Sequence, residues 1–219
     1  MYKRQMHRYQ ILIEYLGTNF IGWQIQQKGQ TIQGIIEVKL SNLLNEEISL
    51  LGSGRTDSGV HAIAQSAHFD TKGKINDLVK FLKSINHFVN KKDISILEIK
   101  KKNLSFHARF SAKQRIYKYI IFNRLSSPSI EKKRGWHISK KLDVNLMKKG
   151  AKKLLGTKDF STFRSSSCNA KSPIKTMKSI KIKSVKDKIE IQFKSQSFLQ
   201  QQVRSMVGCL KYLGEKNGI

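Results

Sequence analysis

The sequence has few cysteines, few acidic residues and no long apolar run, and each shortage narrows the class of protein. Its two cysteines, Cys168 and Cys209, are too few and too far apart for a disulfide framework or a cysteine zinc site. We therefore expect both thiols to be reduced, in a structural role. The 39% of hydrophobic residues is ordinary for a chain of 219 residues that folds around a real core.

No stretch approaches the roughly eighteen consecutive apolar residues that indicate a transmembrane helix. The N-terminal residues 1–8 are basic, but they lead into no apolar segment of signal-peptide length. We therefore expect a soluble, cytoplasmic protein with no membrane partner.

Acidic residues are outnumbered, with 15 Asp and Glu against 42 Lys and Arg, so the formal net charge is +27. Solubility needs far less, and a polyanionic partner is the natural inference, although an AT-rich coding sequence would also favour lysine. Residues 1–109 carry 16 basic and 9 acidic side chains, and residues 110–219 carry 26 and 6. The second half should therefore present the more positive surface.

Residues 52–62 read GSGRTDSGVHA, and three glycines among polar side chains suit neither a helix nor a strand interior. A loop with one carboxylate, Asp57, between two apolar segments is a good place to look for chemistry. One alternative is a simple turn in which the carboxylate of Asp57 accepts local backbone N–H groups. A P-loop is excluded because no Gly-Lys-Ser/Thr follows, and Asp57 with His61 lacks a third metal ligand at a usable spacing.

The alternation and capping signals predict an α+β fold in two halves, residues 1–105 and 106–219. In the first half they predict the order β-α-β-β-α-β, which is ferredoxin-like, with Thr31 and Asn76 as helix N-caps. In the second half they predict a strand at 114–122, a helix capped by Asp143, an irregular segment at 156–176, a hairpin at 177–195 and a helix at 198–213. The second half therefore lacks its closing strand, and we expect an unpaired edge beside the 114–122 strand.

The 54–62 stretch closely resembles the Gly-Arg-Thr-Asp-x-Gly-Val-His-Ala signature of the TruA family of tRNA pseudouridine synthases. Further resemblances lie at 17–24, 106–112 (FHARFSA), 117–119, 160–164 (FSTFR) and 203–208 (VRSMVG), so they cover nearly the whole chain. The family implies the pseudouridine synthase fold, with a cleft between the sheets of two ferredoxin-like halves. It also implies no cofactor and no metal. Ser58 and Gln202 depart mildly from the residues that relatives often have.

The resemblance implies roles for particular residues. Asp57 matches the catalytic aspartate, Tyr117 the tyrosine that stacks on the flipped uracil, and Arg204 the basic partner of the carboxylate. Without the family, the residue types alone favour a core strand aromatic for Tyr117, and a solvated charge or a phosphate contact for Arg204. Arg55 is expected to hold open the position that the flipped base leaves, or to contact a neighbouring phosphate.

Other polar residues are expected to contact RNA or to support the fold. Arg109 and Arg164 are candidate contacts to the RNA backbone. The histidines His61 and His107 are expected to be structural, because loop histidines usually hydrogen-bond locally. The aromatic residues of the 17–24 segment can either pack in the core or touch RNA.

As the family implies, we expect an isomerase that converts uridine to pseudouridine at positions 38 to 40 of the tRNA anticodon arm, as a homodimer. The alternative is a basic tRNA-binding module that keeps the fold but catalyses weakly or not at all. Because relatives continue for several dozen residues, we also expect this chain to be a fragment or a truncated product with reduced stability.

Overall fold

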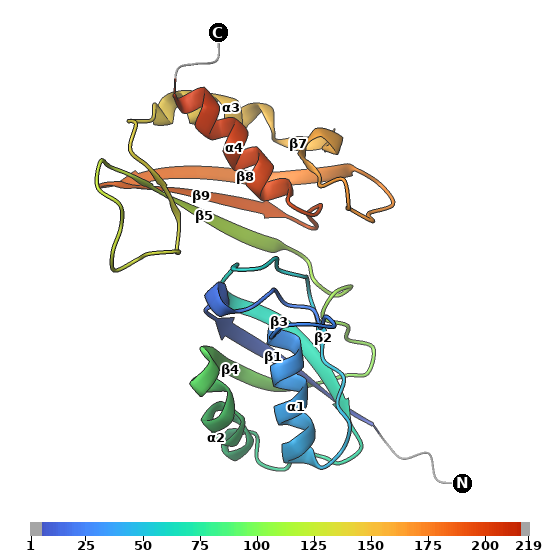
Figure 1. Cartoon of the computed structure of the whole chain (residues 1–219). Helices are drawn as coiled ribbons and strands as arrows, with labels where there is room; N and C mark the ends of the chain where they lie inside the picture. The colour runs from blue at the N-terminus through green and yellow to red at the C-terminus, as the bar shows by residue number, and fades with distance from the viewer. Residues whose placement is uncertain (1–5, 216–219) are drawn as a thin grey trace. The chain divides into compact units, whose positions relative to one another are not determined.

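The computed structural model describes residues 6–215; the basic residues 1–5 of the N-terminus and residues 216–219 lie outside the described part. The chain divides into two compact units, Met1–Ala112 and Lys113–Ile219 (Figure 1). Each unit has its own sheet, its own pair of helices and its own hydrophobic core. The predicted α+β class and the pseudouridine synthase fold are confirmed.

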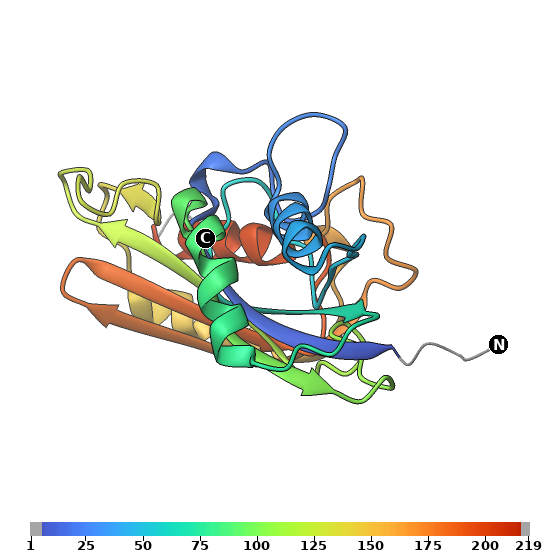
Figure 2. The same cartoon turned by 90° about the horizontal axis from the view of Figure 1, so that it is seen from below.

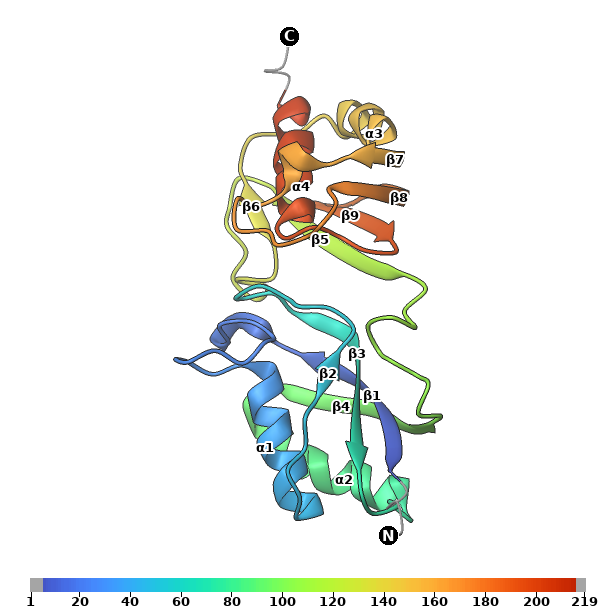
Figure 3. The ribbon, with the colours of Figure 1, turned by 90° about the vertical axis from the view of Figure 1, so that its right-hand side faces the viewer.

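The first unit has the predicted β-α-β-β-α-β order, with two short 3-10 helices added. Its antiparallel sheet has the strand order β2-β3-β1-β4, so the last strand lies beside the first. Both α-helices pack on one face of this sheet (Figure 3). The elements are β1 (His7–Tyr15), η1 (Gly17–Asn19), α1 (Ile32–Leu44), β2 (Leu51–Gly52), β3 (Ala62–Thr71), α2 (Leu78–Val89), η2 (Asn90–Lys92) and β4 (Ile94–Lys102).

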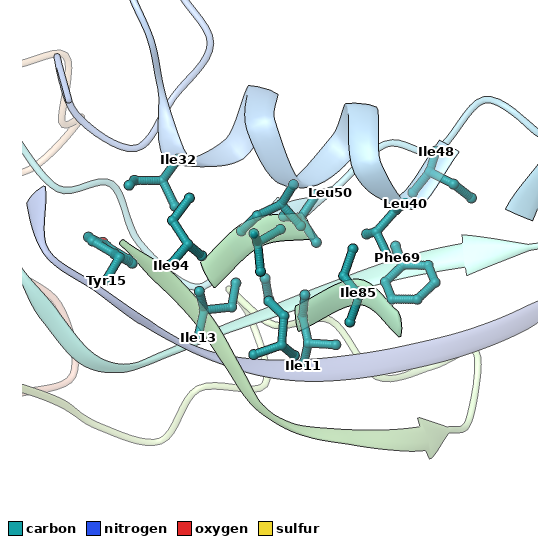
Figure 4. Close-up of a cluster of buried hydrophobic side chains, with 14 of the residues drawn as sticks. Ile11, Ile13, Tyr15, Ile32, Leu40, Ile48, Leu50, Phe69, Ile85 and Ile94 are labelled. Atoms are coloured by element: carbon teal, nitrogen blue, oxygen red, sulfur yellow. The ribbon is translucent and has the colours of Figure 1, made fainter. Parts of the chain in front are cut away.

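The core of the first unit forms because alternate residues of β1 point toward the helices. Tyr9, Ile11, Ile13 and Tyr15 are each at most 2% exposed, as the alternation of the sequence predicts. Ile32 of α1 and other isoleucine and leucine side chains close over them from the helical side (Figure 4). Burial of each large apolar side chain contributes about 1.5–3 kcal/mol, so this layer fixes the sheet that carries the 52–62 loop.

Helix capping in the first unit follows one prediction and corrects another. Thr31 caps α1, and its hydroxyl accepts the N–H of Gly34 at 3.2 Å. The cap of α2 is Asp77 rather than Asn76, because the Asp77 carboxylate accepts the N–H of Lys80 at 2.8 Å. The negative charge of Asp77 at this position also interacts favourably with the positive, N-terminal end of the helix dipole.

The second unit forms a five-stranded sheet with the order β6-β5-β9-β8-β7. Helices α3 and α4 cover one of its faces (Figure 1). The predicted hairpin is confirmed as β8 and β9, the long orange and red strands in Figure 2, with Asp187 in its turn. The elements are β5 (Arg115–Asn123), β6 (Trp136–Ile138), α3 (Val144–Lys153), β7 (Gly156–Asp159), η3 (Ser161–Phe163), β8 (Ile174–Val185), β9 (Lys188–Ser195) and α4 (Gln202–Gly214).

The predicted unpaired edge beside β5 is corrected only for the last residues of this strand. The short strand β6, which the sequence did not predict, pairs in parallel with the last residues of β5, from Ile121 to Asn123. On its other side β5 pairs with β9 along the stretch from Arg115 to Phe122. The short parallel strand β6 therefore covers the edge of β5 only at its end and does not extend to the part of β5 that bears Tyr117.

Two further boundaries in the second unit correct the prediction. The segment expected to be irregular contains β7, which pairs with β8 from Gly156↔Met177 to Asp159↔Ile174. Helix α4 begins at Gln202 rather than at 198, because Gln201 takes a left-handed conformation with φ 60° and the Gln202 side chain accepts the N–H of Leu199 at 2.8 Å. Strand β7 depends on its pairing with β8, and the start of α4 depends on the local conformation around Gln201. Residue periodicity indicates neither of them.

The boundary between the units falls after Ala112 rather than after residue 105. The segment 106–112 belongs with the first unit, because the Arg8 guanidinium donates to the carbonyl oxygen of Phe106 at 2.5 Å. The N–H of Ala108 also donates to Nδ1 of His68 at 3.2 Å. Within residues 6–215, no helix is both long and apolar enough to cross a membrane.

Candidate active site

The loop that carries Asp57 runs from β2 to β3 and is tied to β3 where it begins. Gly52 pairs with Ala67, and the N–H of Ser53 donates to the carbonyl oxygen of Ser66 at 2.8 Å. The Gln65 side-chain amide donates to the carbonyl oxygen of Gly54. The first residues of the loop are therefore held against β3 by hydrogen bonds.

The middle of the loop is held by the segment that follows β1. The N–H of Trp23 donates to the carbonyl oxygen of Thr56 at 3.0 Å, and the N–H of Gly59 donates to that of Phe20 at 3.3 Å. The Tyr15 and Thr56 hydroxyls share a hydrogen bond of 2.9 Å. Because Phe20 is 4% and Trp23 is 3% exposed, the aromatic side chains of this segment are core residues that support the loop.

Two glycines allow the two segments to approach closely. A Cβ on Gly17 would lie 2.0 Å from the carbonyl oxygen of Val60, a distance that real atoms do not reach. A Cβ on Gly22 would lie 2.7 Å from the carbonyl oxygen of Thr56, and its φ of +121° already favours glycine. The 17–22 segment and the loop therefore require glycine at both contacts.

His61 has the structural role that was expected of it. Its Nδ1 accepts the N–H of Gly17 at 2.9 Å, which closes the loop against the first residue of η1. In His107, Nδ1 accepts the N–H of Arg109 at 3.1 Å, so this histidine also supports local backbone.

Asp57 itself is exposed, and only its main chain is used in the turn. Its carbonyl oxygen accepts the N–H of Val60 at 3.2 Å. Across the described residues, 6–215, the carboxylate makes no hydrogen bond and no ion pair. The alternative of a simple turn, in which this carboxylate accepts local backbone N–H groups, is therefore wrong. The loop thus presents one acidic group to solvent on a fixed backbone, with the exposed Arg55 two residues before it.

The segment that bears Arg109 is anchored by a buried histidine and an ion pair. The Arg8 guanidinium binds both oxygens of Asp70 at 2.7 Å; these hydrogen bonds lower the pKa of the Asp70 carboxyl and raise that of Arg8. His68 is 1% exposed, and burial, with the nearby Arg8 and His107, lowers its pKa to about 4. A neutral His68 accepts the N–H of Ala108, while the side chain of Arg109 is exposed.

In the second unit, Tyr117 and Arg204 lie in one region of the sheet and helix α4. The Tyr117 ring is half-buried and contacts Phe198 edge-on, with ring centroids 4.9 Å apart. Tyr119, the next residue on that face of β5, has a pKa raised by burial and partly lowered again by the Arg204 guanidinium. Arg204 is exposed, and its charge acts on Tyr119, on the face of β5 that carries the two tyrosines; we call this the tyrosine face.

Arg164 directly follows η3, the short 3-10 helix that begins after the buried Phe160. Its N–H donates to the carbonyl oxygen of Ser161 at 3.3 Å, and its side chain is exposed. Its charge also contributes to the lowered pKa of Asp159, although hydrogen bonds from Ser161 are the main cause. Arg164 is thus presented on a short, well-defined turn.

No group of three or more His, Cys, Asp or Glu side chains in the described part of the chain is arranged to hold a metal ion. Asp57, Arg55 and Arg109 belong to the first unit, and Tyr117, Arg164 and Arg204 belong to the second. The meeting of Asp57 with Tyr117 and Arg204 therefore stays a prediction.

Comparison with known proteins gives these residues a context. Residues 11–111 and 151–218 match the family described as tRNA pseudouridine synthase. The tRNA pseudouridine synthase A of Pelagibacter ubique is 76% identical over 210 residues, which are 96% of this chain and 85% of the relative. The proteins of the same name from Zymomonas mobilis and Paramagnetospirillum magneticum are 40% and 43% identical, over 96% of this chain and 85% and 82% of their own lengths.

The chain belongs to the TruA family of tRNA pseudouridine synthases. It is therefore an enzyme of the isomerase class. The TruA signature at residues 54–62 is the part of the chain that the 17–23 segment fixes from one side and β3 from the other. Sequence reasoning found this loop through its glycines and its carboxylate.

Sequence reasoning did not find the supports of the TruA loop. Tyr15 reads as one more strand residue, and nothing in the pattern marks its hydroxyl as a partner of Thr56. The same holds for His68, whose neutral ring binds the backbone of the 106–112 segment. The spacing of Gly17 and Gly22 is the one signal that could have indicated a close approach of two backbones.

Proposed function

We propose that this chain converts uridine to pseudouridine at positions 38 to 40 of the tRNA anticodon arm, with Asp57 as the catalytic carboxylate. The observation that carries the proposal is the exposed Asp57 side chain, which stands in the family signature on a loop whose backbone is fixed on both sides. A carboxylate that makes no hydrogen bond and no ion pair within residues 6–215 is available to a substrate.

The reaction requires one reactive group in a fixed position. The bond between ribose C1′ and uracil N1 breaks, the base rotates, and C1′ joins C5; C5 then loses its proton and N1 gains one. The atoms balance with no oxidation or reduction. Asp57 can act as nucleophile on C6 or on C1′, or it can assist proton removal, and all three roles need its ionised form.

A base inside a stem or loop must leave its stack before this chemistry can begin. Tyr117 is proposed to stack on the flipped uracil, and its half-buried ring, held by Phe198, is a preformed surface for that purpose. Arg55, exposed beside Asp57, is proposed to occupy the vacated position or to contact the adjoining phosphate.

Arg204 is proposed to lie beside Asp57 in the working enzyme and to favour the ionised carboxylate. Its exposed guanidinium, near the tyrosine face of β5, supports this role. Arg109 and Arg164, both exposed on well-defined turns, are proposed contacts to the RNA backbone. The homodimer and the cytoplasmic location that the family implies are also proposals, and light scattering after gel filtration tests the first.

The test is pseudouridine formation on tRNA by the purified chain without added cofactor, read by carbodiimide-adduct primer extension. Asp57→Asn keeps the shape of the side chain and should reduce turnover by roughly 10³-fold or more, with tRNA affinity within about twofold. Glu47→Gln, which removes another exposed carboxylate of the first unit, is the matched control and should retain full activity.

Full activity of Asp57→Asn would contradict the proposed role of this carboxylate. A wild-type chain that binds tRNA tightly and forms no pseudouridine would instead favour the alternative, a basic tRNA-binding module. The net charge of +27 is the observation that favours this alternative, because it suits the binding of a polyanion.

A further inference from the structure

We propose that the second unit holds a separate phosphate-binding pocket, lined by Arg124, Lys140, Lys141 and Lys186, that grips the tRNA backbone at a distance from the flipped base. The proposal rests on tRNA as the substrate, and it adds a contact that the reaction itself does not use. We call this cavity the basic pocket.

The basic pocket has a volume of about 620 Å³ and lies where the end of β5 meets the segment before α3 and the β8–β9 turn. Four cationic side chains line it against one carboxylate, that of Asp187. Its lining also includes apolar side chains, among them Leu142 and Ile189, while the four cationic residues are exposed to solvent, where a polyanion can meet them. Such a cavity attracts an anion.

The backbone around the basic pocket is held in place by Asn123. The Asn123 amide donates to the carbonyl oxygens of Ile138 and Lys140 at 2.9 and 2.7 Å, and its side-chain oxygen accepts the N–H of Leu142 at 3.0 Å. The Asn123 N–H also donates to the carbonyl oxygen of Asp187 at 2.7 Å. One residue thus fixes both the lysine-bearing segment and the turn opposite it.

The single carboxylate of the basic pocket is already neutralised. The Arg124 guanidinium lies 2.6 Å from the Asp187 carboxylate and also donates to the carbonyl oxygen of Ser126 at 2.9 Å. This pair fixes the turn that presents Lys186, which is exposed, as is Lys141 on the facing segment. Lysine binds phosphate as a mobile point charge, so the two lysines can reach one backbone from two sides.

The place of the basic pocket on β5 indicates which part of an RNA it meets. Tyr117 and Asn123 are six residues apart on this strand, which is roughly 20 Å at about 3.3 Å per residue. None of the described lining residues is aromatic, so no side chain there offers a surface for base stacking. A sugar-phosphate backbone about half a helical turn from the flipped base fits better than a free nucleotide.

The experiment compares tRNA binding by the wild-type chain and by Lys141→Glu/Lys186→Glu. We expect a roughly tenfold weaker affinity for full-length tRNA at moderate salt, and a log-log salt slope that is shallower by about 2. The control Lys80→Glu/Lys83→Glu changes two exposed lysines of α2 and lowers the formal charge equally, from +27 to +23. Its affinity should stay within about twofold of the wild type.

A second probe is a hairpin that holds the target loop and only about three closing base pairs, which extend roughly 10 Å. The basic pocket lies beyond this reach, so the lysine variant should bind the hairpin within about twofold of the wild type. A charge of the opposite sign gives a further check, because Asp187→Asn keeps an acceptor for Arg124 and should tighten the binding of full-length tRNA.

Equal weakening by the α2 control, equal weakening for the short hairpin, or unchanged affinity of the lysine variant would each overturn the basic pocket as a tRNA contact. So would competition in which inorganic phosphate fills the pocket without loss of tRNA affinity. If the wild-type chain binds tRNA but forms no pseudouridine, the proposed catalysis fails while the binding result still tests the basic pocket.

Discussion

The two units of this chain differ in how they use charge. Residues 1–112 carry 16 basic and 9 acidic side chains, and residues 113–219 carry 26 and 6. In the first unit the loop around Asp57 is held by uncharged hydrogen bonds and buried aromatic rings, and one carboxylate is presented to solvent. In the second unit the lysines and arginines themselves are the prominent surface feature.

This difference separates the two tasks of an enzyme that modifies RNA. The chemical step needs one group in a fixed position, which a rigid loop supplies at little cost in charge. Binding of a polyanion needs many cations, and no single one of them needs an exact position. We therefore expect changes in the first unit to act mainly on turnover and changes in the second to act mainly on affinity. The proposed roles of Tyr117 and Arg204 in the second unit and of Arg109 in the first make these three residues exceptions.

Arg204→Leu should break this rule most strongly. If Arg204 keeps Asp57 ionised, turnover should fall roughly 10- to 100-fold while tRNA affinity changes less than about threefold, and the activity profile should move to higher pH. Arg204→Lys should be intermediate, because the charge remains but the planar fork does not. Weaker binding with normal turnover at saturating tRNA would identify Arg204 as a phosphate contact instead.

Gly17→Ala tests the rigidity of the loop without touching a charge. The new Cβ would lie 2.0 Å from the carbonyl oxygen of Val60, so the loop must shift. We expect a loss of about 2–4 kcal/mol in the free energy of unfolding and roughly tenfold slower turnover. Gly73→Ala is the control, since a Cβ there meets no atom within 4 Å. Thermal unfolding and single-turnover assays measure the two effects.

The sequence predicted the parts of the fold that periodicity and capping determine. The alternation of β1, the caps Thr31 and Asp143, and the β8–β9 hairpin all follow from local chemistry. The sequence did not predict strands β6 and β7, because both are short. In addition, all side chains of β7 are exposed, so this strand has no alternation of buried and exposed residues. Their pairing is decided by the strands beside them.

The candidate site divides in the same way. The TruA signature identified Asp57, but hydrogen bonds from distant residues set its loop geometry, and no local pattern indicates that Trp23 would bind Thr56. The carboxylate's lack of intramolecular partners in residues 6–215 is likewise a tertiary property. Sequence reasoning thus located the reactive group and could not describe what holds it.

A pH effect on stability should arise in the first unit from His68. Its pKa of about 4 in the native state is below the usual 6.5, so between these values the unfolded chain binds a proton that the native state does not. Stability should therefore fall as the pH drops from about 6.5 toward 4, by about 2 kcal/mol at pH 5.

Urea unfolding at pH 7.5 and pH 5 measures this effect, and His68→Gln should lose most of it. The Arg8–Asp70 pair acts in a lower range: because the pKa of Asp70 is lowered, its contribution persists above about 3.8 and is lost as the pH falls through the native value. Equal pH dependence in wild type and His68→Gln would assign the effect to other groups.

Ser58→Ala should have the smallest effect and shows what kind of contact holds the loop. The Ser58 hydroxyl donates to the carbonyl oxygen of Phe20 at 3.2 Å, but that oxygen also accepts the N–H of Gly59 at 3.3 Å. Its removal leaves no buried group without a partner, so we expect less than about 0.5 kcal/mol and less than a roughly twofold change in turnover. Tyr15→Phe, which removes the buried tyrosine hydroxyl that shares a hydrogen bond with the Thr56 hydroxyl, should cost about 1 kcal/mol. If Ser58→Ala slowed turnover as much as Gly17→Ala, side-chain hydroxyls rather than the close approach of two backbones would fix the position of Asp57.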